Sequence, residues 1–189
     1  IPNITSELRQ FAQAIHIDKD LNIAGHSLGG SVATVYASQY PFDTQSLFLL
    51  SSAGIYKQAN TRYAKDPKTL KNLLVYKQGD FEQVIHKLMT TLPKVPSELK
   101  AAQEQILISK SSKTNQAIDQ IVKLNRIYTP DTFAQLTRNV EAPTLIMWGK
   151  QDQIINYEVA SELHLLLKRS EKPIILNNVG HMPIIEAEK

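Results

Sequence analysis

Short apolar runs separated by amphipathic stretches form the main pattern of this chain. Four runs are almost continuously apolar: 21–24 (LNIA), 46–50 (SLFLL), 144–148 (TLIMW) and 173–176 (PIIL). Continuous rather than alternating apolar residues are typical of strands buried on both faces of a parallel sheet. The pattern therefore predicts four parallel strands.

Helical patterns lie between these runs. The first covers residues 4–15, where an apolar stripe recurs at helical spacing: Ile4, Leu8, Phe11, Ala12 and Ile15. A second predicted helix covers 30–40 and ends before Pro41, and a third covers 157–167. Strands that alternate with helices predict an α/β fold, with right-handed crossovers and helices on both faces of a parallel sheet.

The central region, 56–139, breaks this alternation. It contains amphipathic helical patterns, interrupted by a prolyl break at 91–98 (TLPKVPSE), and no convincing strand. Ordinary crossover helices are the alternative interpretation, but a crossover of this length is unusual in a plain βαβ unit. We therefore expect a core segment over 1–55, a helical cap over 56–139 and a second core segment over 140–189.

Composition excludes several classes of site and partner. The 189 residues suffice for one domain with a small appended lobe. The chain has no cysteine, which excludes disulfides, thiolate metal sites and a cysteine nucleophile. Its net charge is +3, and the scattered lysines indicate a solvated surface rather than a nucleic-acid site. No apolar run approaches the ~20 residues that cross a bilayer.

The stretch 24–30 (AGHSLGG) carries the strongest chemical signal. It contains G-x-S-x-G around Ser27, with a predicted strand before it and a predicted helix after it. In that setting the chain reverses sharply at the serine, and we expect Gly25 and Gly29 to remove steric collisions at the turn. The N–H of Leu28 would then point outward from a helix N-terminus and could donate to an oxyanion. A helix N-cap is the alternative for Ser27, but it does not explain both flanking glycines.

A nucleophilic serine needs a base and an orienting acid near the same sheet edge. Asp152 follows the third predicted strand and His181 follows the fourth, so both should lie at the carboxyl ends of neighbouring strands. The order serine, aspartate, histidine is the one expected for this architecture. The competing histidines and acids are less favourably placed along the chain: His16, His26, His86, His164, Asp43 and Glu186.

Three stretches resemble the α/β-hydrolase superfamily: LNIAGHSLGGSVATVYASQYP, TLIMWGKQD and NNVGHMPIIEAEK. The resemblance is to the carboxylesterase and lipase branch, including enzymes similar to monoacylglycerol lipase. It implies that Ser27 is the nucleophile, Asp152 the acid and His181 the base. It also implies that the Leu28 N–H forms half of the oxyanion hole, and that 56–139 is the lid over the pocket.

Substrate contacts are expected next to this machinery. His26 and Met182, the neighbours of Ser27 and His181, are the predicted substrate-binding residues. Apolar residues of the helical region could line an acyl pocket: Leu70, Leu73, Leu74, Phe81, Val84, Ile85, Leu88 and Met89. Packing of the lid onto the core is the alternative role for each of them.

The chain also departs from the family pattern. Family members usually carry three or four strands and an HG motif before the nucleophile strand, whereas one predicted helix and no HG dipeptide precede residue 21 here. We therefore expect that about a hundred N-terminal residues are missing, with the second oxyanion donor and any leader among them. The cytoplasm is then the default compartment. The edge of strand 21–24 would be open, which predicts self-association.

The expected reaction is hydrolysis of a small-molecule ester or lipid through an acyl-enzyme, without metal or organic cofactor. Two alternatives stay open. One is a carbon–carbon bond hydrolase of the meta-cleavage-product type, which uses the same three residues. The other is a non-catalytic binding protein with a hydrolase-like fold. We expect no nucleic-acid partner and no transmembrane segment in this chain.

Overall fold

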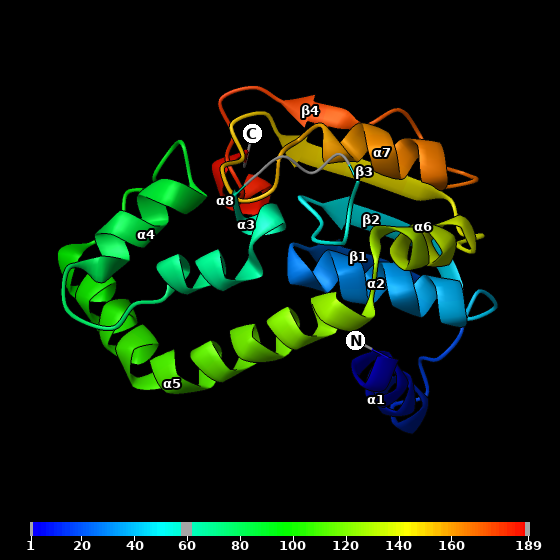
Figure 1. Cartoon of the computed structure of the whole chain (residues 1–189), viewed down its shortest axis with the longest axis horizontal. Coiled ribbons are helices and arrows are strands. Elements are labelled where there is room, and N and C mark those ends of the chain that lie inside the picture. Colours follow the sequence, from blue (N-terminus) through cyan, green and yellow to red (C-terminus); the bar gives the residue numbers. More distant parts are fainter. Residues whose placement is uncertain (1, 58–61, 188–189) are drawn as a thin grey trace.

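A four-stranded parallel sheet forms the centre of the molecule. The computed structural model describes residues 2–57 and 62–187. The strands lie in the order β1 (Leu21–His26), β2 (Thr44–Leu50), β3 (Thr144–Gly149) and β4 (Ile174–Leu176) (Figure 1). Each neighbouring pair is parallel. All four predicted strands are therefore confirmed, and the carboxyl ends of the four lie at one edge of the sheet.

The main core lies between the central strands and three helices. These are α2 (Leu28–Gln39), α6 (Pro130–Arg138) and α7 (Val159–Leu166). Small buried residues of α2 let this helix approach the sheet closely. The largest fully buried side chain is that of Trp148 on β3, which packs in the cluster with Leu49 of β2 and Leu163 of α7. The predicted parallel sheet flanked by helices is confirmed.

Burial across the sheet is uneven. Most residues of β2 and β3 are buried or half-buried, with Gln45 the exposed exception, whereas β1 and β4, at the two edges, contain one buried residue between them. Helix α1 (Pro2–Ala14) contacts α2 and buries Thr5 and Ala12. Apart from Ala12, the residues of the apolar stripe predicted over 4–15 are exposed, with Phe11 at 60%. Strand β1 is an outer strand of the sheet formed by the described residues, and self-association through it stays a prediction.

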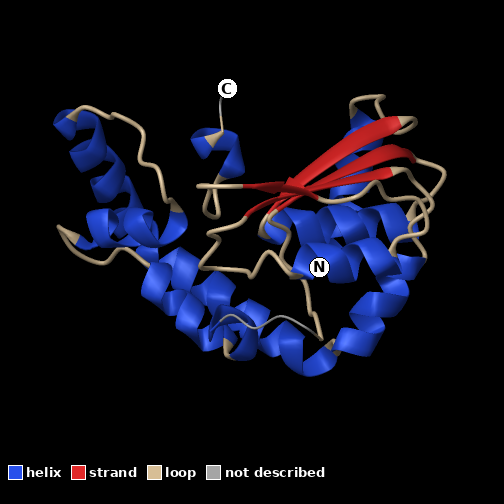
Figure 2. Ribbon diagram, turned by 90° about the horizontal axis from the view of Figure 1, so that it is seen from above, coloured by secondary structure: helices blue, strands red, loops and turns tan. Residues whose placement is uncertain are grey.

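A helical cap follows β2. It comprises α3 (Arg62–Lys65), the 3₁₀ helix η1 (Pro67–Leu73), α4 (Asp80–Leu88) and the 31-residue α5 (Ser97–Ile127). Figure 1 shows α4 on the side of the molecule away from the strands and α5 running from there back towards the core, and Figure 2 shows the molecule from above. The prolyl break predicted at 91–98 lies mostly in the connection between these two helices.

Helix α6, the last helix of the region 56–139, packs on the core, and the boundaries predicted for the cap stay a prediction. Helix α6 contacts α2 and α7, and Phe133 of α6 is part of the main core. Its buried face therefore belongs to the sheet layer, although no strand separates it from the cap. A short helix, α8 (Pro183–Glu186), follows β4. Among the described residues, no helix has both the length and the apolar character needed to cross a membrane.

Candidate active site

Ser27 occupies a strained turn between β1 and α2. Its backbone has φ 51° and ψ −124°, a conformation that non-glycine residues rarely adopt. Hydrogen bonds hold it there: Ser27 N donates to Leu50 O at 3.1 Å, and Ser27 O accepts from Gly30 N at 2.9 Å and Ala53 N at 2.8 Å. The predicted reversal at the serine is therefore confirmed, and the neighbouring strand β2 supports it.

The glycines around the turn differ in whether a side chain would fit in their place. A Cβ on Gly25 would lie 2.5 Å from the carbonyl oxygen of Gly29, so a side chain at 25 collides with backbone. A Cβ on Gly30 would lie 2.3 Å from Ser52 Oγ and 2.9 Å from Ser52 Cα. At Gly29, however, a Cβ would meet no described atom within 4 Å. The predicted collision is thus correct for Gly25 and wrong for Gly29, because α2 turns position 29 away from the strand.

Leu28 begins α2 directly after the turn. As the first helical residue, it has an N–H group with no acceptor inside the helix. The positive end of the helix dipole lies at the same place, which favours negative charge. This N–H can therefore donate to an oxyanion formed beside Ser27.

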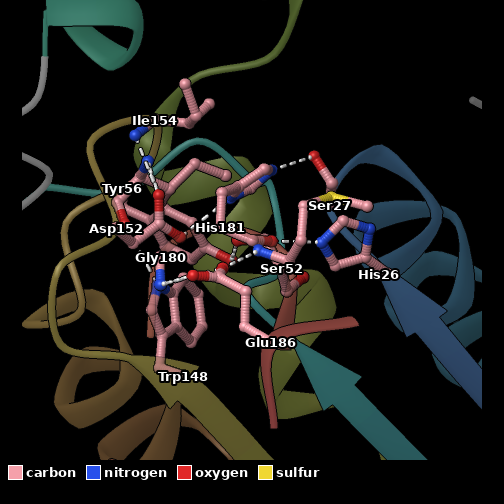
Figure 3. A network of polar contacts seen from close by, with 12 residues as sticks. His26, Ser27, Ser52, Tyr56, Trp148, Asp152, Ile154, Gly180, His181 and Glu186 are labelled. Carbon is pink, nitrogen blue, oxygen red and sulfur yellow. Dashed lines mark hydrogen bonds and ion pairs between the residues drawn. The ribbon is translucent and has the colours of Figure 1, made fainter. Parts of the chain in front are cut away.

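Ser27, His181 and Asp152 form a continuous hydrogen-bonded chain (Figure 3). His181 Nε2 lies 2.9 Å from Ser27 Oγ, and His181 Nδ1 lies 2.8 Å from Asp152 Oδ2. His181 and Asp152 are buried. A carboxylate only accepts, so the proton of the neutral imidazole is on Nδ1, and Nε2 is free to accept the hydroxyl proton. The structure brings together the three residues that the sequence placed at separate strand ends.

The second oxygen of Asp152 fixes the orientation of the carboxylate. Oδ1 accepts from the N–H groups of Ile154 at 2.8 Å and Ile155 at 2.9 Å. Trp148 Nε1 in turn donates to Ile155 O at 3.0 Å, which ties this loop to β3. With Oδ1 bound to backbone, Oδ2 is directed at the imidazole of His181.

His26 is not among the residues that line the cavity beside Ser27, and its predicted substrate contact stays a prediction. Its Nε2 lies 2.6 Å from the backbone oxygen of His181, and the two ring centroids are 4.9 Å apart. Burial lowers the pKa of His26 below its ordinary value. Met182 is also outside the described lining of the cavity, and its N–H donates to Glu186 Oε1 at 3.2 Å. The observed contacts of both residues involve the loop that carries His181.

A cavity of about 580 Å³ opens beside Ser27 and Leu28. Apolar side chains from the cap and the core dominate its wall, among them Leu70, Leu73, Leu74, Ile118, Phe133 and Ile155. A cavity of this size and character suits an apolar ligand with its polar end at Ser27.

The cap residues predicted to line this pocket divide into groups. Leu70, Leu73 and Leu74 line the cavity beside Ser27. Phe81, Ile85 and Met89 instead line a separate cavity of about 420 Å³ between α4 and α5. The remaining two, Val84 and Leu88, line neither. Helical spacing identified the apolar face of α4 but not the cavity that this face borders.

Glu186, by sequence only a less favourable candidate for the acid, binds the loop that carries His181. Its carboxylate accepts from the N–H of Gly180, at 2.9 Å and 3.0 Å for the two oxygens. A side chain that binds backbone amides leaves no residue-type signal in its partners, so the sequence offered no sign of this contact. Within the described ranges, no group of three or more His, Asp or Glu residues is arranged to hold a metal ion.

Known proteins similar to this chain include lipases. The chain is 30% identical over 184 residues to Lipase 1 of Psychrobacter immobilis, covering 96% of this chain and 56% of the lipase. It is 27% identical over 188 residues to a monoacylglycerol lipase of Xenopus laevis, covering 95% of this chain and 55% of that enzyme. The crystal structure of a candidate lipase from Acinetobacter baumannii superimposes with a TM-score of 0.97 at 54% identity, covering 99% of this chain and 62% of the other.

The chain therefore spans little more than half the length of the curated relatives it matches. The sequence model that describes the alpha/beta hydrolase fold matches residues 4–188, which is nearly all of the chain. The predicted resemblance is thereby confirmed, and the chain belongs to the alpha/beta hydrolase fold family.

Proposed function

We propose that this chain carries the reacting groups of a serine hydrolase that cleaves carboxylic esters with apolar acyl groups. The observation that carries the proposal is the chain of hydrogen bonds from Asp152 through His181 to Ser27, with the serine held at a positive φ. The similarity to lipases and the apolar cavity beside Ser27 support the same substrate class.

The reaction proceeds through an acyl-enzyme. Ser27 Oγ attacks the ester carbonyl while His181 Nε2 takes the hydroxyl proton, and Asp152 stabilises the resulting imidazolium. The Leu28 N–H donates to the tetrahedral oxyanion. His181 then gives the proton to the leaving alcohol, and the acyl group stays on Ser27. Water attacks this acyl-enzyme by the same route in reverse, which releases the carboxylic acid.

The cavity accounts for the acyl preference. Its wall contains leucine, isoleucine, phenylalanine and tyrosine side chains from both the core and the cap. An alkyl chain gains free energy by leaving water for such a wall, by about 0.8 kcal/mol per buried methylene. We therefore expect medium-length or long acyl chains to react better than acetyl groups.

The decisive experiment treats the full-length protein with a fluorophosphonate probe and measures hydrolysis of p-nitrophenyl esters of increasing acyl length. We expect covalent labelling at Ser27 and turnover that rises with acyl length. Ser27→Ala should lose both, and Ser161→Ala, at an exposed serine of α7, is the matched control and should keep both.

The outcome also separates the alternative functions. Absence of labelling, with Ser27→Ala equal to wild type, would identify a non-catalytic binding protein. Labelling together with turnover of a vinylogous diketone, but not of any ester, would identify a carbon–carbon bond hydrolase.

A further inference from the structure

The carboxylate of Glu186 binds the backbone on both sides of His181. Gly180 N donates to Oε1 at 2.9 Å and to Oε2 at 3.0 Å, and Met182 N donates to Oε1 at 3.2 Å. Figure 3 shows the carboxylate beside Gly180, below the imidazole of His181. Because the residues before and after His181 are both fixed, the carboxylate restricts the backbone from which the imidazole projects.

The same carboxylate also binds the end of the cap helix α4. Glu186 Oε2 accepts from Thr90 N at 2.7 Å and from Thr91 N at 3.1 Å. These two residues directly follow α4 and its C-cap, and they lie about half the chain away from Glu186 in sequence. One side chain thus joins two segments that no continuous element connects.

Direct backbone contact between the two segments supports this junction. His181 N donates to Leu88 O, the carbonyl of the last α4 residue, at 2.7 Å. A Cβ on Gly180 would lie 2.8 Å from that same oxygen and 3.2 Å from Met89 Cα. The loop of His181 and the end of α4 therefore pack so closely that a side chain at position 180 would collide with the backbone of α4.

An ordinary capping role does not account for the whole set of bonds. Glu186 ends the four-residue helix α8, and a glutamate that reaches back to Met182 N resembles a capping box. A capping side chain would satisfy amides at the start of α8. Capping of α8 does not require bonds to Thr90 and Thr91 of the helical cap. The bonds to these two residues therefore show that Glu186 joins two segments and does more than cap α8.

We infer that Glu186 is a positioning residue that ties the loop of His181 to the cap, so that the imidazole stays aligned with Ser27 while the end of α4 is seated on this loop. The inference rests on the proposed function, in which His181 is the base. It means that the seating of the cap and the alignment of the base are coupled, because the same carboxylate holds both segments.

Glu186→Gln in the full-length protein tests the inference. The amide keeps the shape of the side chain but replaces one acceptor oxygen with an NH₂ group, which cannot accept from a backbone N–H. We expect kcat for a short p-nitrophenyl ester to fall by about 10²-fold, the effect of a misplacement on the order of 1 Å, with KM nearly unchanged. Glu171→Gln, at an exposed glutamate between α7 and β4, is the matched control and should behave as wild type.

Amide hydrogen exchange provides a readout that a merely structural role would not produce. In Glu186→Gln we expect faster exchange in two separate segments, 88–92 and 179–183, while the β2 amides keep their protection. Faster exchange in 179–183 alone would show that Glu186 only caps α8, and the inference that it joins the loop of His181 to α4 would be wrong. Glu186→Asp keeps the charge with a shorter reach, so it should give intermediate kcat and intermediate exchange in both segments, and it serves as the test if the glutamine variant does not fold.

Comparison with Ser27→Ala separates this inference from the proposed function. If Ser27→Ala retains turnover, the proposed function fails. If Ser27→Ala is inactive while Glu186→Gln keeps full kcat, the role of Glu186 alone is wrong. The fraction of molecules that react with fluorophosphonate gives the fraction that is folded and competent. The role of Glu186 is also wrong if kcat, calculated per total protein, falls in Glu186→Gln only in proportion to this fraction, because each competent molecule would then be fully active.

Discussion

His26 Nε2 lies 2.6 Å from the backbone oxygen of His181, so the residue before the serine supports the residue proposed as its base. A carbonyl oxygen only accepts, and the proton of the neutral His26 ring is therefore on Nε2. Burial lowers the pKa of His26, because the protonated ring loses hydration at this half-buried position. His26 is thus bonded to the loop of His181, and its burial there makes protonation of the His26 ring unfavourable.

This cost predicts an acid-sensitive part of the stability. In the unfolded chain a histidine titrates at about 6.5, and in the folded chain the pKa of His26 lies lower. As pH falls below the unfolded value, the unfolded state binds the proton first, so the free energy of unfolding decreases until the folded pKa is also passed. We expect His26→Gln, measured by urea unfolding at several pH values, to lose less stability than wild type between about pH 7 and about pH 5.

A matched comparison isolates the effect of position. His86→Gln removes a histidine from an exposed site of α4. If His26→Gln and His86→Gln change the pH dependence of unfolding equally, burial at position 26 is not the cause.

Asp152→Asn should separate the orienting role of the carboxylate from its role in folding. An asparagine oxygen can still accept from Ile154 N and Ile155 N, so the loop after β3 should persist. Its NH₂ group would face His181 Nδ1 and favour the wrong tautomer of the imidazole. We expect kcat on an ester to fall by about 10³–10⁴-fold with little change in thermal stability.

The control for this variant is Asp131→Asn, at an exposed aspartate paired with Lys57. It should keep wild-type turnover. Near-normal kcat in Asp152→Asn would show that His181 does not depend on this carboxylate, and steady-state kinetics with a melting curve decides the question.

Substitution by alanine should lower the free energy of unfolding strongly at Gly25 but hardly change it at Gly29. Gly25→Ala places a Cβ 2.5 Å from a backbone oxygen that cannot move independently, and we expect a loss of about 2–3 kcal/mol in the free energy of unfolding. Gly29→Ala places its Cβ in open space within α2, so the change should be under about 1 kcal/mol, with alanine favoured in a helix. Denaturant unfolding measures both, and equal losses would refute the assignment of the collision to Gly25.

The periodicity of the sequence predicted the sheet and the positions of Ser27, Asp152 and His181 because both follow from local rules. A buried parallel strand needs a continuous apolar run, and the carboxyl ends of parallel strands meet at one edge. Three polar residues just beyond three such runs are therefore brought to the same edge of the sheet, and the loop after β4 carries His181 back across it to Ser27. The strained turn at Ser27 was predictable for the same reason, since its signal lies within five residues.

The remaining features depend on contacts between distant segments. Glu186 accepts hydrogen bonds from backbone amides of the cap. Every residue type except proline has such an amide, so the sequence does not indicate which ones Glu186 binds. The apolar face of α4 borders a cavity of its own because α5 packs beside it. The apolar stripe of the first helix is exposed except at Ala12, and α1 meets α2 through a polar contact, the hydrogen bond from Thr5 to Gln39. Helical spacing gives the face of a helix, whereas the partner of that face is a property of the tertiary structure.

The cavity beside Ser27 extends along one face of α2, and this predicts a residue that limits acyl length. Leu28, Ser31, Val35 and Gln39 are spaced at helical intervals and all line it. At 1.5 Å per residue, Val35 lies about 12 Å along α2 from the serine. A short acyl group ends before that point, whereas a long one reaches it.

Val35→Phe should therefore reduce kcat/KM for a long-chain p-nitrophenyl ester relative to the acetate ester by about tenfold, a size expected when a ligand loses part of an apolar pocket. The extra volume also costs about 1–3 kcal/mol of stability, so activity is measured well below the melting temperature. Val32→Phe, on the same helix but outside the lining of the cavity, controls for the added bulk. An equal loss on short and long esters in Val35→Phe would show that acyl chains do not run along α2.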